Sequence, residues 1–142
     1  MKTMILILSI LLLTTGCSED ETVQQENSIL GTWQLIETKF NDANGAGRWE
    51  PVENGRIIIF NQDLSYESEI YPTDCGGINS STYRIQNESE INVVEITITC
   101  VNPNMVFEST DSFSFDENSN LILIPIEPEC PEGCAFKYEK VE

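Results

Sequence analysis

From residue 30 onward, hydrophobic and polar side chains alternate with a period of two. The segment 94–100, VEITITC, puts Val94, Ile96 and Ile98 on one face and its polar residues on the other. The segment 64–71, LSYESEIY, alternates in the same way. This period is typical of antiparallel strands with one buried face, because successive side chains of a strand point to opposite faces.

Clusters of Asn, Asp, Gly and Pro separate the alternating runs at near-regular intervals, as expected for turns between strands. The pattern predicts strands at 31–40, 55–60, 64–71, 81–87, 91–100, 105–115, 120–126 and 134–142. Pro125 cannot donate to a strand ladder, so we expect it at a strand end or a bulge. No helix longer than one turn is predicted.

These strands predict an all-β fold, an eight-stranded antiparallel up-and-down barrel. Short antiparallel strands in succession favour closure, because a closed barrel has no exposed edges. A barrel of this size is either filled by side chains or holds one small ligand.

The N-terminal segment 1–16, MKTMILILSILLLTTG, has one Lys followed by an apolar run. The run is shorter than the ~20 residues that span a bilayer, and it is typical of a signal peptide. Small residues ending in Gly directly before Cys17 resemble the bacterial lipobox, whose cysteine is acylated and becomes the mature N-terminus. We therefore expect a lipoprotein held on the outer membrane by palmitate-type chains on Cys17, since each buried CH₂ adds about 0.8 kcal/mol to membrane binding.

Residues 17–28 are mostly polar and predict an acidic, flexible tether ahead of a barrel domain at 29–142. The run of acids at Glu19, Asp20 and Glu21 resembles a signal that directs lipoproteins to the cell surface. A solvated tether explains the same residues, and the sequence leaves both interpretations open.

The charge balance is strongly acidic, with 24 Asp and Glu against 7 Lys and Arg and a formal net charge of −17. Such a surface repels nucleic acid and anionic lipid head groups, so we expect neither as a partner. We expect a hydrated monomer that contacts the membrane through its N-terminal lipid.

The stretch LGTWQLIE, with Gly31 and Trp33 opening the first strand, resembles the start of lipocalins. The whole order of motifs is similar to the lipocalin-like lipoproteins of Bacteroidota. This resemblance implies a barrel plugged at one end by Trp33 and open at the other. Lipocalins commonly pack that Trp against an Arg near the end of the barrel, whereas the last strand here has Lys137 and Lys140.

Strand alternation places the four remaining cysteines and the long loop 41–54 at one end of the barrel, the open end in lipocalin-like proteins. Four cysteines in an exported protein allow three disulfide connectivities. We favour Cys75 with Cys100 and Cys130 with Cys134. A zinc site is the weaker alternative, because the chain has no His and no Cys-x-x-Cys pair. We expect no metal and no cofactor.

The sequence does not predict an enzyme. With no histidine, the usual base for a Ser or Cys nucleophile is missing. The segment 116–120, DENSN, begins like a calcium loop, but Leu121 stands where that loop needs Gly.

Two functions remain. The first is binding of a small, apolar ligand at the open end, with contacts from Trp49, Tyr66 and Tyr83, although ordinary packing also explains both tyrosines. The second is a non-catalytic interaction module whose barrel is filled. A ligand cavity needs on the order of 300 Å³, so the volume inside the barrel separates the two.

Overall fold

The computed structural model describes residues 28–41, 47–69, 71–88, 90–102 and 105–141. The predicted signal peptide at 1–16, the anchor residue Cys17 and nearly all of the tether lie outside these residues. Within the described ranges, no helix has the length and apolarity needed to cross a membrane.

The described part of the chain forms nine strands and one short 3-10 helix. The elements are β1 (Gly31–Phe40), β2 (Arg48–Pro51), β3 (Ile57–Phe60), β4 (Tyr66–Ser68), η1 (Thr73–Cys75), β5 (Ile78–Glu88), β6 (Ile91–Cys100), β7 (Val106–Phe115), β8 (Leu121–Glu127) and β9 (Cys134–Val141). The predicted strands 31–40 and 91–100 coincide with β1 and β6, and the other predicted strands fall on β3, β4, β5, β7, β8 and β9.

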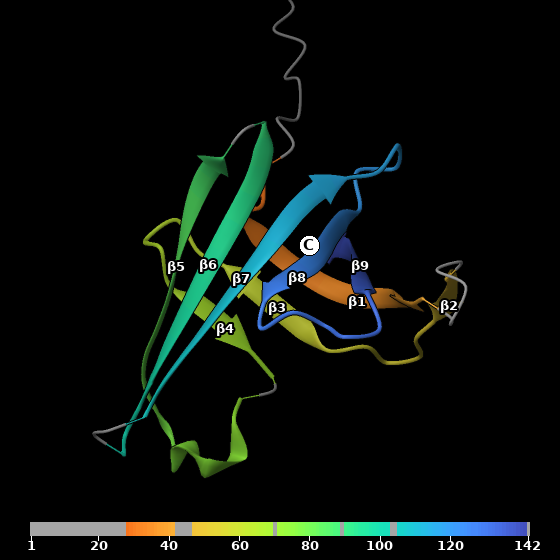
Figure 1. Cartoon of the computed structure of the whole chain (residues 1–142). Coiled ribbons are helices and arrows are strands. Elements are labelled where there is room, and N and C mark those ends of the chain that lie inside the picture. Colours follow the sequence, from red (N-terminus) through yellow and green to blue (C-terminus); the bar gives the residue numbers. More distant parts are fainter. Residues whose placement is uncertain (1–27, 42–46, 70, 89, 103–104, 142) are drawn as a thin grey trace, which may run out of the picture.

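Eight of these strands form one antiparallel sheet in the order β4-β3-β1-β9-β8-β7-β6-β5. The sheet curls so that its edge strands approach each other. A single bridge joins Ser65 to Thr82, and the Tyr83 N–H donates to the Leu64 carbonyl at 2.9 Å. In Figure 1, the long strands β5, β6 and β7 cross the direction of β1 and β3, as expected for two sides of a barrel. The predicted all-β barrel is thus confirmed in a nearly closed form.

Two details differ from the prediction. The loop predicted at 41–54 contains β2, which pairs with the second half of β1 and adds no strand to the barrel order. Leu64, predicted to face the core, is 54 % exposed, because it lies in a turn with φ of 65° and donates its N–H to the Asn61 carbonyl. The strand β4 therefore begins only at Tyr66.

Pro125 lies inside β8, next to a register irregularity in the pairing with β7. The pairing of β8 with β9 ends at Leu123 and Phe136, two residues before the proline. The missing N–H of Pro125 therefore falls at a bulge, as predicted.

One end of the barrel is closed by Trp33, which is 1 % exposed. Its indole N–H donates to the Ile29 carbonyl at 2.7 Å, and its ring lies 6.0 Å from that of Phe115. The Lys140 ammonium lies 5.3 Å from the ring centroid of Trp33. The expected plug is confirmed, with a lysine over the indole ring.

The four cysteines form the two favoured disulfides, Cys75 with Cys100 and Cys130 with Cys134. The first joins the loop before β5 to the last residue of β6, and both of its cysteines are 2 % exposed. The second closes the loop between β8 and β9. Because the strands alternate in direction, both disulfides lie at the end opposite Trp33.

Candidate functional site

A cavity of about 280 Å³, partly open to solvent, lies between the inward faces of the strands at the end of the barrel that carries the disulfides. Its walls come from the residue before β3, from β4, β6, β7, β8 and β9, and from the residue after β8. The lining residues are Arg56, Tyr66, Ser68, Ile96, Ser109, Asp111, Leu123, Pro125, Glu127, Pro128, Phe136 and Tyr138. Only Arg56 among them is a base, so the site combines a single cation with carboxylates, hydroxyls and apolar side chains.

The cavity exists because the inward residues of β7 change type along the strand. Phe113 and Phe115 fill the half of the barrel near Trp33, with their rings 6.2 Å apart. Two and four residues before Phe113, the same face carries Asp111 and Ser109, and both line the cavity. Small polar side chains at inward positions leave space where the aromatic side chains leave none.

Arg56 enters the barrel at a close approach between two backbone segments. The Leu35 N–H of β1 donates to the Arg56 carbonyl at 3.0 Å. Gly55 is buried beside this contact, and a Cβ on it would clash with the Leu35 carbonyl oxygen. A glycine is therefore required for the chain to pass close to β1 and bring Arg56 to the cavity.

The Arg56 guanidinium is held in place by two aromatic residues of β9. Its Nε and Nη2 atoms both donate to the Tyr138 hydroxyl, at 3.1 and 2.9 Å. Its central carbon lies 5.2 Å from the centroid of the Phe136 ring. Tyr138 itself is 1 % exposed, and burial raises the pKa of its hydroxyl although the charge of Arg56 opposes the rise. The phenol therefore stays neutral and accepts from Arg56.

Asp111 lines the same cavity and carries the charge opposite to that of Arg56. Burial raises the pKa of its carboxyl to about 6, while the positive charge of Arg56 lowers it. Among the described residues, none forms a hydrogen bond or an ion pair with this carboxylate. A carboxylate that is desolvated without a partner is costly in a core and typical of functional sites.

Tyr66 connects the cavity to the packed half of the barrel. Its ring lies 5.3 Å from that of Phe60, which is 1 % exposed, and burial raises the pKa of its hydroxyl to about 12. The phenol is therefore a neutral hydrogen-bonding group at ordinary pH. Ser68, on the same face of β4, also lines the cavity.

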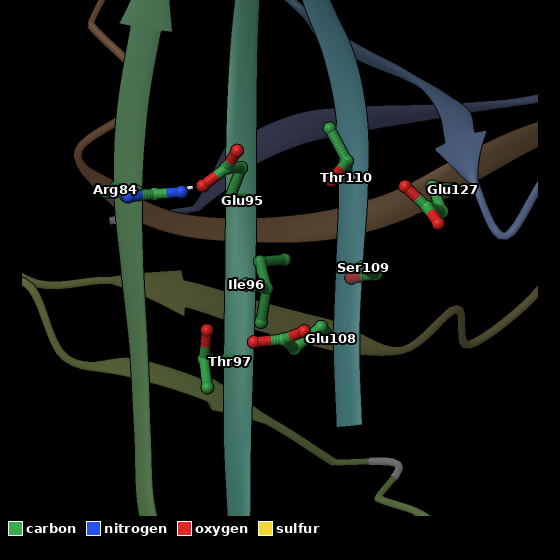
Figure 2. Close-up of a pocket in the computed structure, with 8 residues that line it drawn as sticks. All are labelled: Arg84, Glu95, Ile96, Thr97, Glu108, Ser109, Thr110 and Glu127. Carbon is green, nitrogen blue, oxygen red and sulfur yellow. Dashed lines mark hydrogen bonds and ion pairs between the residues drawn. The ribbon is translucent and has the colours of Figure 1, made fainter. Parts of the chain in front are cut away.

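A second, wider hollow of about 580 Å³ lies on the outer side of the strands β5, β6 and β7. Figure 2 shows the side chain of Arg84 reaching from β5 to Glu95 on β6, where the two form an ion pair. Glu108 and Glu127 add further acids. This hollow is larger than the interior cavity, but Arg84 is 69 % exposed and water screens its charge. We regard the interior cavity as the stronger candidate because burial raises the pKa values of three of its groups, Tyr66, Asp111 and Tyr138.

The two hollows share Ile96, Ser109 and Glu127. The pairing of β7 with β8 ends at Thr110 and Glu127, so the first residues of β7 have no partner on the β8 side. The interior cavity therefore borders the outer hollow where this pairing ends.

Of the three residues that the sequence predicted as ligand contacts, only Tyr66 lines the interior cavity. Tyr83 is 4 % exposed, packs edge-on to Phe60 at 5.0 Å and donates its hydroxyl to the Asn61 carbonyl at 2.8 Å. Trp49 lies on β2, opposite Lys39 in the register with β1, and its ring is covered by Lys137 at 4.5 Å.

Six further polar residues line the cavity and were not predicted from the sequence: Arg56, Ser68, Ser109, Asp111, Glu127 and Tyr138. One signal was available. Asp111 stands at the same alternation parity as Phe113 and Phe115, so an acid occupies an inward position of a strand whose next inward residues are aromatic. No comparable pattern marks Arg56, which directly precedes its strand.

Comparison with protein-family models, curated proteins and solved structures finds no match to this chain. The geometry itself defines a nearly closed β-barrel with a cavity whose lining combines apolar and charged side chains. This architecture is compatible with ligand binding.

Proposed function

We propose that this chain is a lipid-anchored, lipocalin-like binding protein whose barrel cavity holds one small ligand. The observation that carries the proposal is the interior cavity of about 280 Å³ at the disulfide end. This volume is close to the lower limit for small-molecule sites, on the order of 300 Å³. It weighs against the alternative of an interaction module with a filled barrel.

The ligand is better described as small and partly polar than as purely apolar. Ile96, Leu123 and Phe136 offer apolar surface, whereas Arg56 and Asp111 offer opposite charges in the same space. A purely apolar ligand would cover both charges without binding either, which costs free energy. A ligand with polar groups at one end and an apolar body suits this lining.

Native mass spectrometry of the full protein, purified from its source without denaturation, tests the proposal. We expect a bound small molecule in the wild type and its loss in Ser109→Phe, which fills the cavity from β7. Ser114→Phe is the matched control, because Ser114 is exposed on the opposite face of the same strand. Circular dichroism checks that both variants keep the barrel. Equal adducts in the two variants, or no adduct on the wild type, would contradict binding in the cavity.

The proposed anchor is Cys17, supported by the lipobox-like residues before it. Replacing Cys17 with Ser should move the protein from the outer-membrane fraction to the soluble fraction, because Ser cannot carry the acyl chains that bury in the membrane. Retention in the membrane would overturn the anchor. Display on the cell surface is tested separately by changing Glu19, Asp20 and Glu21 to Ala, which should reduce protease accessibility on intact cells.

A further inference from the structure

The cavity holds two opposite charges that do not neutralise each other. Arg56 is fixed by the Tyr138 hydroxyl and the Phe136 ring, both on β9. Asp111 projects from β7, and its carboxylate forms no ion pair with Arg56 or with any other described residue. The two charges are close enough to act on each other and on Tyr66 and Tyr138. The described part of the barrel thus holds an unpaired cation and an unpaired anion in one partly buried cavity.

Both groups have hydrogen-bonding capacity that the fold does not use. Two N–H groups of Arg56 donate to the Tyr138 hydroxyl, and its other guanidinium N–H groups donate to no described residue. Both oxygens of Asp111 are without a donor among the described residues. Unpaired polar groups in a partly buried site destabilise the fold. A ligand that pairs with both Arg56 and Asp111 at once therefore gains the most binding free energy.

We propose that the cavity recognises a small amphoteric molecule, whose ammonium group pairs with Asp111 and whose carboxylate pairs with Arg56. Its apolar body lies against Ile96, Leu123 and Phe136. The inference rests on the proposed function, since it needs a ligand inside the barrel, and it adds the chemical class of that ligand. A site with one fixed cation and one fixed anion favours a ligand with the complementary dipole over one with a single charge.

The size of the cavity restricts the ligand further. A volume of about 280 Å³ corresponds to roughly nine water molecules at ~30 Å³ each. A compound with the size of a single amino acid fits this space, whereas a long acyl chain or a macrocycle does not. Glu127 lines both the cavity and the outer hollow, and its negative charge helps attract the ammonium group.

A matched set of probes tests this inference by isothermal titration calorimetry on the full protein at pH 7.5. The probes are leucine, 3-methylbutylamine, which lacks the carboxylate, and 4-methylpentanoate, which lacks the ammonium group. We expect leucine to bind at least about tenfold more tightly than either single-charge analogue. Each analogue loses the hydrogen bonds to one charged group, and that loss weakens affinity by about tenfold.

Variants of Asp111 and Arg56 test which group of the ligand each residue binds. Asp111→Asn should weaken leucine binding by about tenfold or more and leave 4-methylpentanoate unaffected. Arg56→Met should weaken leucine and leave 3-methylbutylamine unaffected. Glu108→Gln on the outer face of β7 and Arg84→Gln on β5 are the controls and should leave every affinity unchanged. If Arg56→Met fails to fold, Asp111→Asn decides alone, because it removes an unpaired charge.

Three results would overturn the inference. They are equal binding of 3-methylbutylamine and leucine, equal binding of 4-methylpentanoate and leucine, and no binding of any probe. None of them bears on the cavity-filling experiment, so the proposed function is judged separately by the adduct that Ser109→Phe removes and Ser114→Phe keeps.

Discussion

The inward-facing residues differ in size and polarity between the two halves of the barrel. Near Trp33, the inward residues are large and apolar, and the one polar atom of the indole donates to the Ile29 carbonyl. At the disulfide end, the inward residues of β7 are Ser109 and Asp111, and the carboxylate has no partner among the described residues. One half is packed and satisfied, and the other is hollow and charged.

This difference assigns stability and binding to separate halves. Burial of aromatic side chains drives folding in the closed half, because buried apolar area is the dominant favourable contribution. The open half keeps groups that weaken the free protein and suit a ligand. Residues in binding sites commonly lower the stability of the ligand-free protein, and ligand binding offsets that loss.

The largest expected effect distinguishes the two tryptophans. Trp33→Ala should lower the free energy of unfolding by about 3–5 kcal/mol, because it removes a fully buried ring from the closed half. Trp49→Ala should cost clearly less, since Trp49 lies outside the barrel interior under Lys137. Urea unfolding monitored by circular dichroism measures both. Similar losses would show that the closed half is not the main source of stability.

The disulfides are expected to rank next. Replacing Cys75 and Cys100 with Ala should cost about 3 kcal/mol, because this disulfide closes a loop with a sequence separation of 25. Replacing Cys130 and Cys134 should cost less, since their separation is 4. Both double variants should keep the barrel spectrum, because neither disulfide belongs to the main core. Loss of the folded barrel in either one would contradict this ranking.

The fold was predictable where alternation is regular. The run from Val94 to Cys100 lies in β6. Because every second strand of an up-and-down barrel ends on the same side, the strand order placed Cys75, Cys100, Cys130 and Cys134 at one end. The strand β2 was not predictable, because Arg48–Pro51 is short, lacks alternation and becomes a strand only by pairing with β1.

The site was harder to predict than the fold. Tyr66 was found because an aromatic residue on an inward position is a natural contact for a ligand. Arg56 and Asp111 were missed because a pattern of polar and apolar residues assigns charged side chains to the outer face. Only the strand register of the nearly closed barrel shows that Arg56 and Asp111 line the same cavity.

The pH dependence of stability sharpens the comparison further. The pKa of Asp111 is about 6 in the folded protein against a reference of 3.8. The folded state therefore binds more protons between about pH 4 and 6, and its stability falls as the pH rises through this window. Asp111→Asn should remove this fall and make the free protein about 3 kcal/mol more stable at pH 7, with no difference below pH 4.

The groups around Asp111 set the control for this experiment. Arg56 from before β3, Tyr66 from β4, Glu127 from β8 and Tyr138 from β9 line the same cavity. Glu108→Gln changes an acid on the outer face of the same strand and should keep the fall in stability between pH 4 and 6. Thermal unfolding across this range measures both variants, and an unaltered slope in Asp111→Asn would show that the carboxyl is not the cause.

The smallest change in stability, and the sharpest test of charge separation, is expected for Tyr138→Phe. Losing the hydroxyl removes two hydrogen bonds to Arg56, at a cost of about 1 kcal/mol. The released guanidinium can then turn toward Asp111, and an ion pair between them would offset part of that cost. NMR titration of the Asp111 carboxyl should show its pKa falling below the wild-type value of about 6. Tyr83→Phe is the control, because its hydroxyl binds the Asn61 carbonyl away from the cavity and its loss should leave the Asp111 titration unchanged. If the pKa of Asp111 stays at the wild-type value in Tyr138→Phe, then Tyr138 is not what keeps the two charges apart.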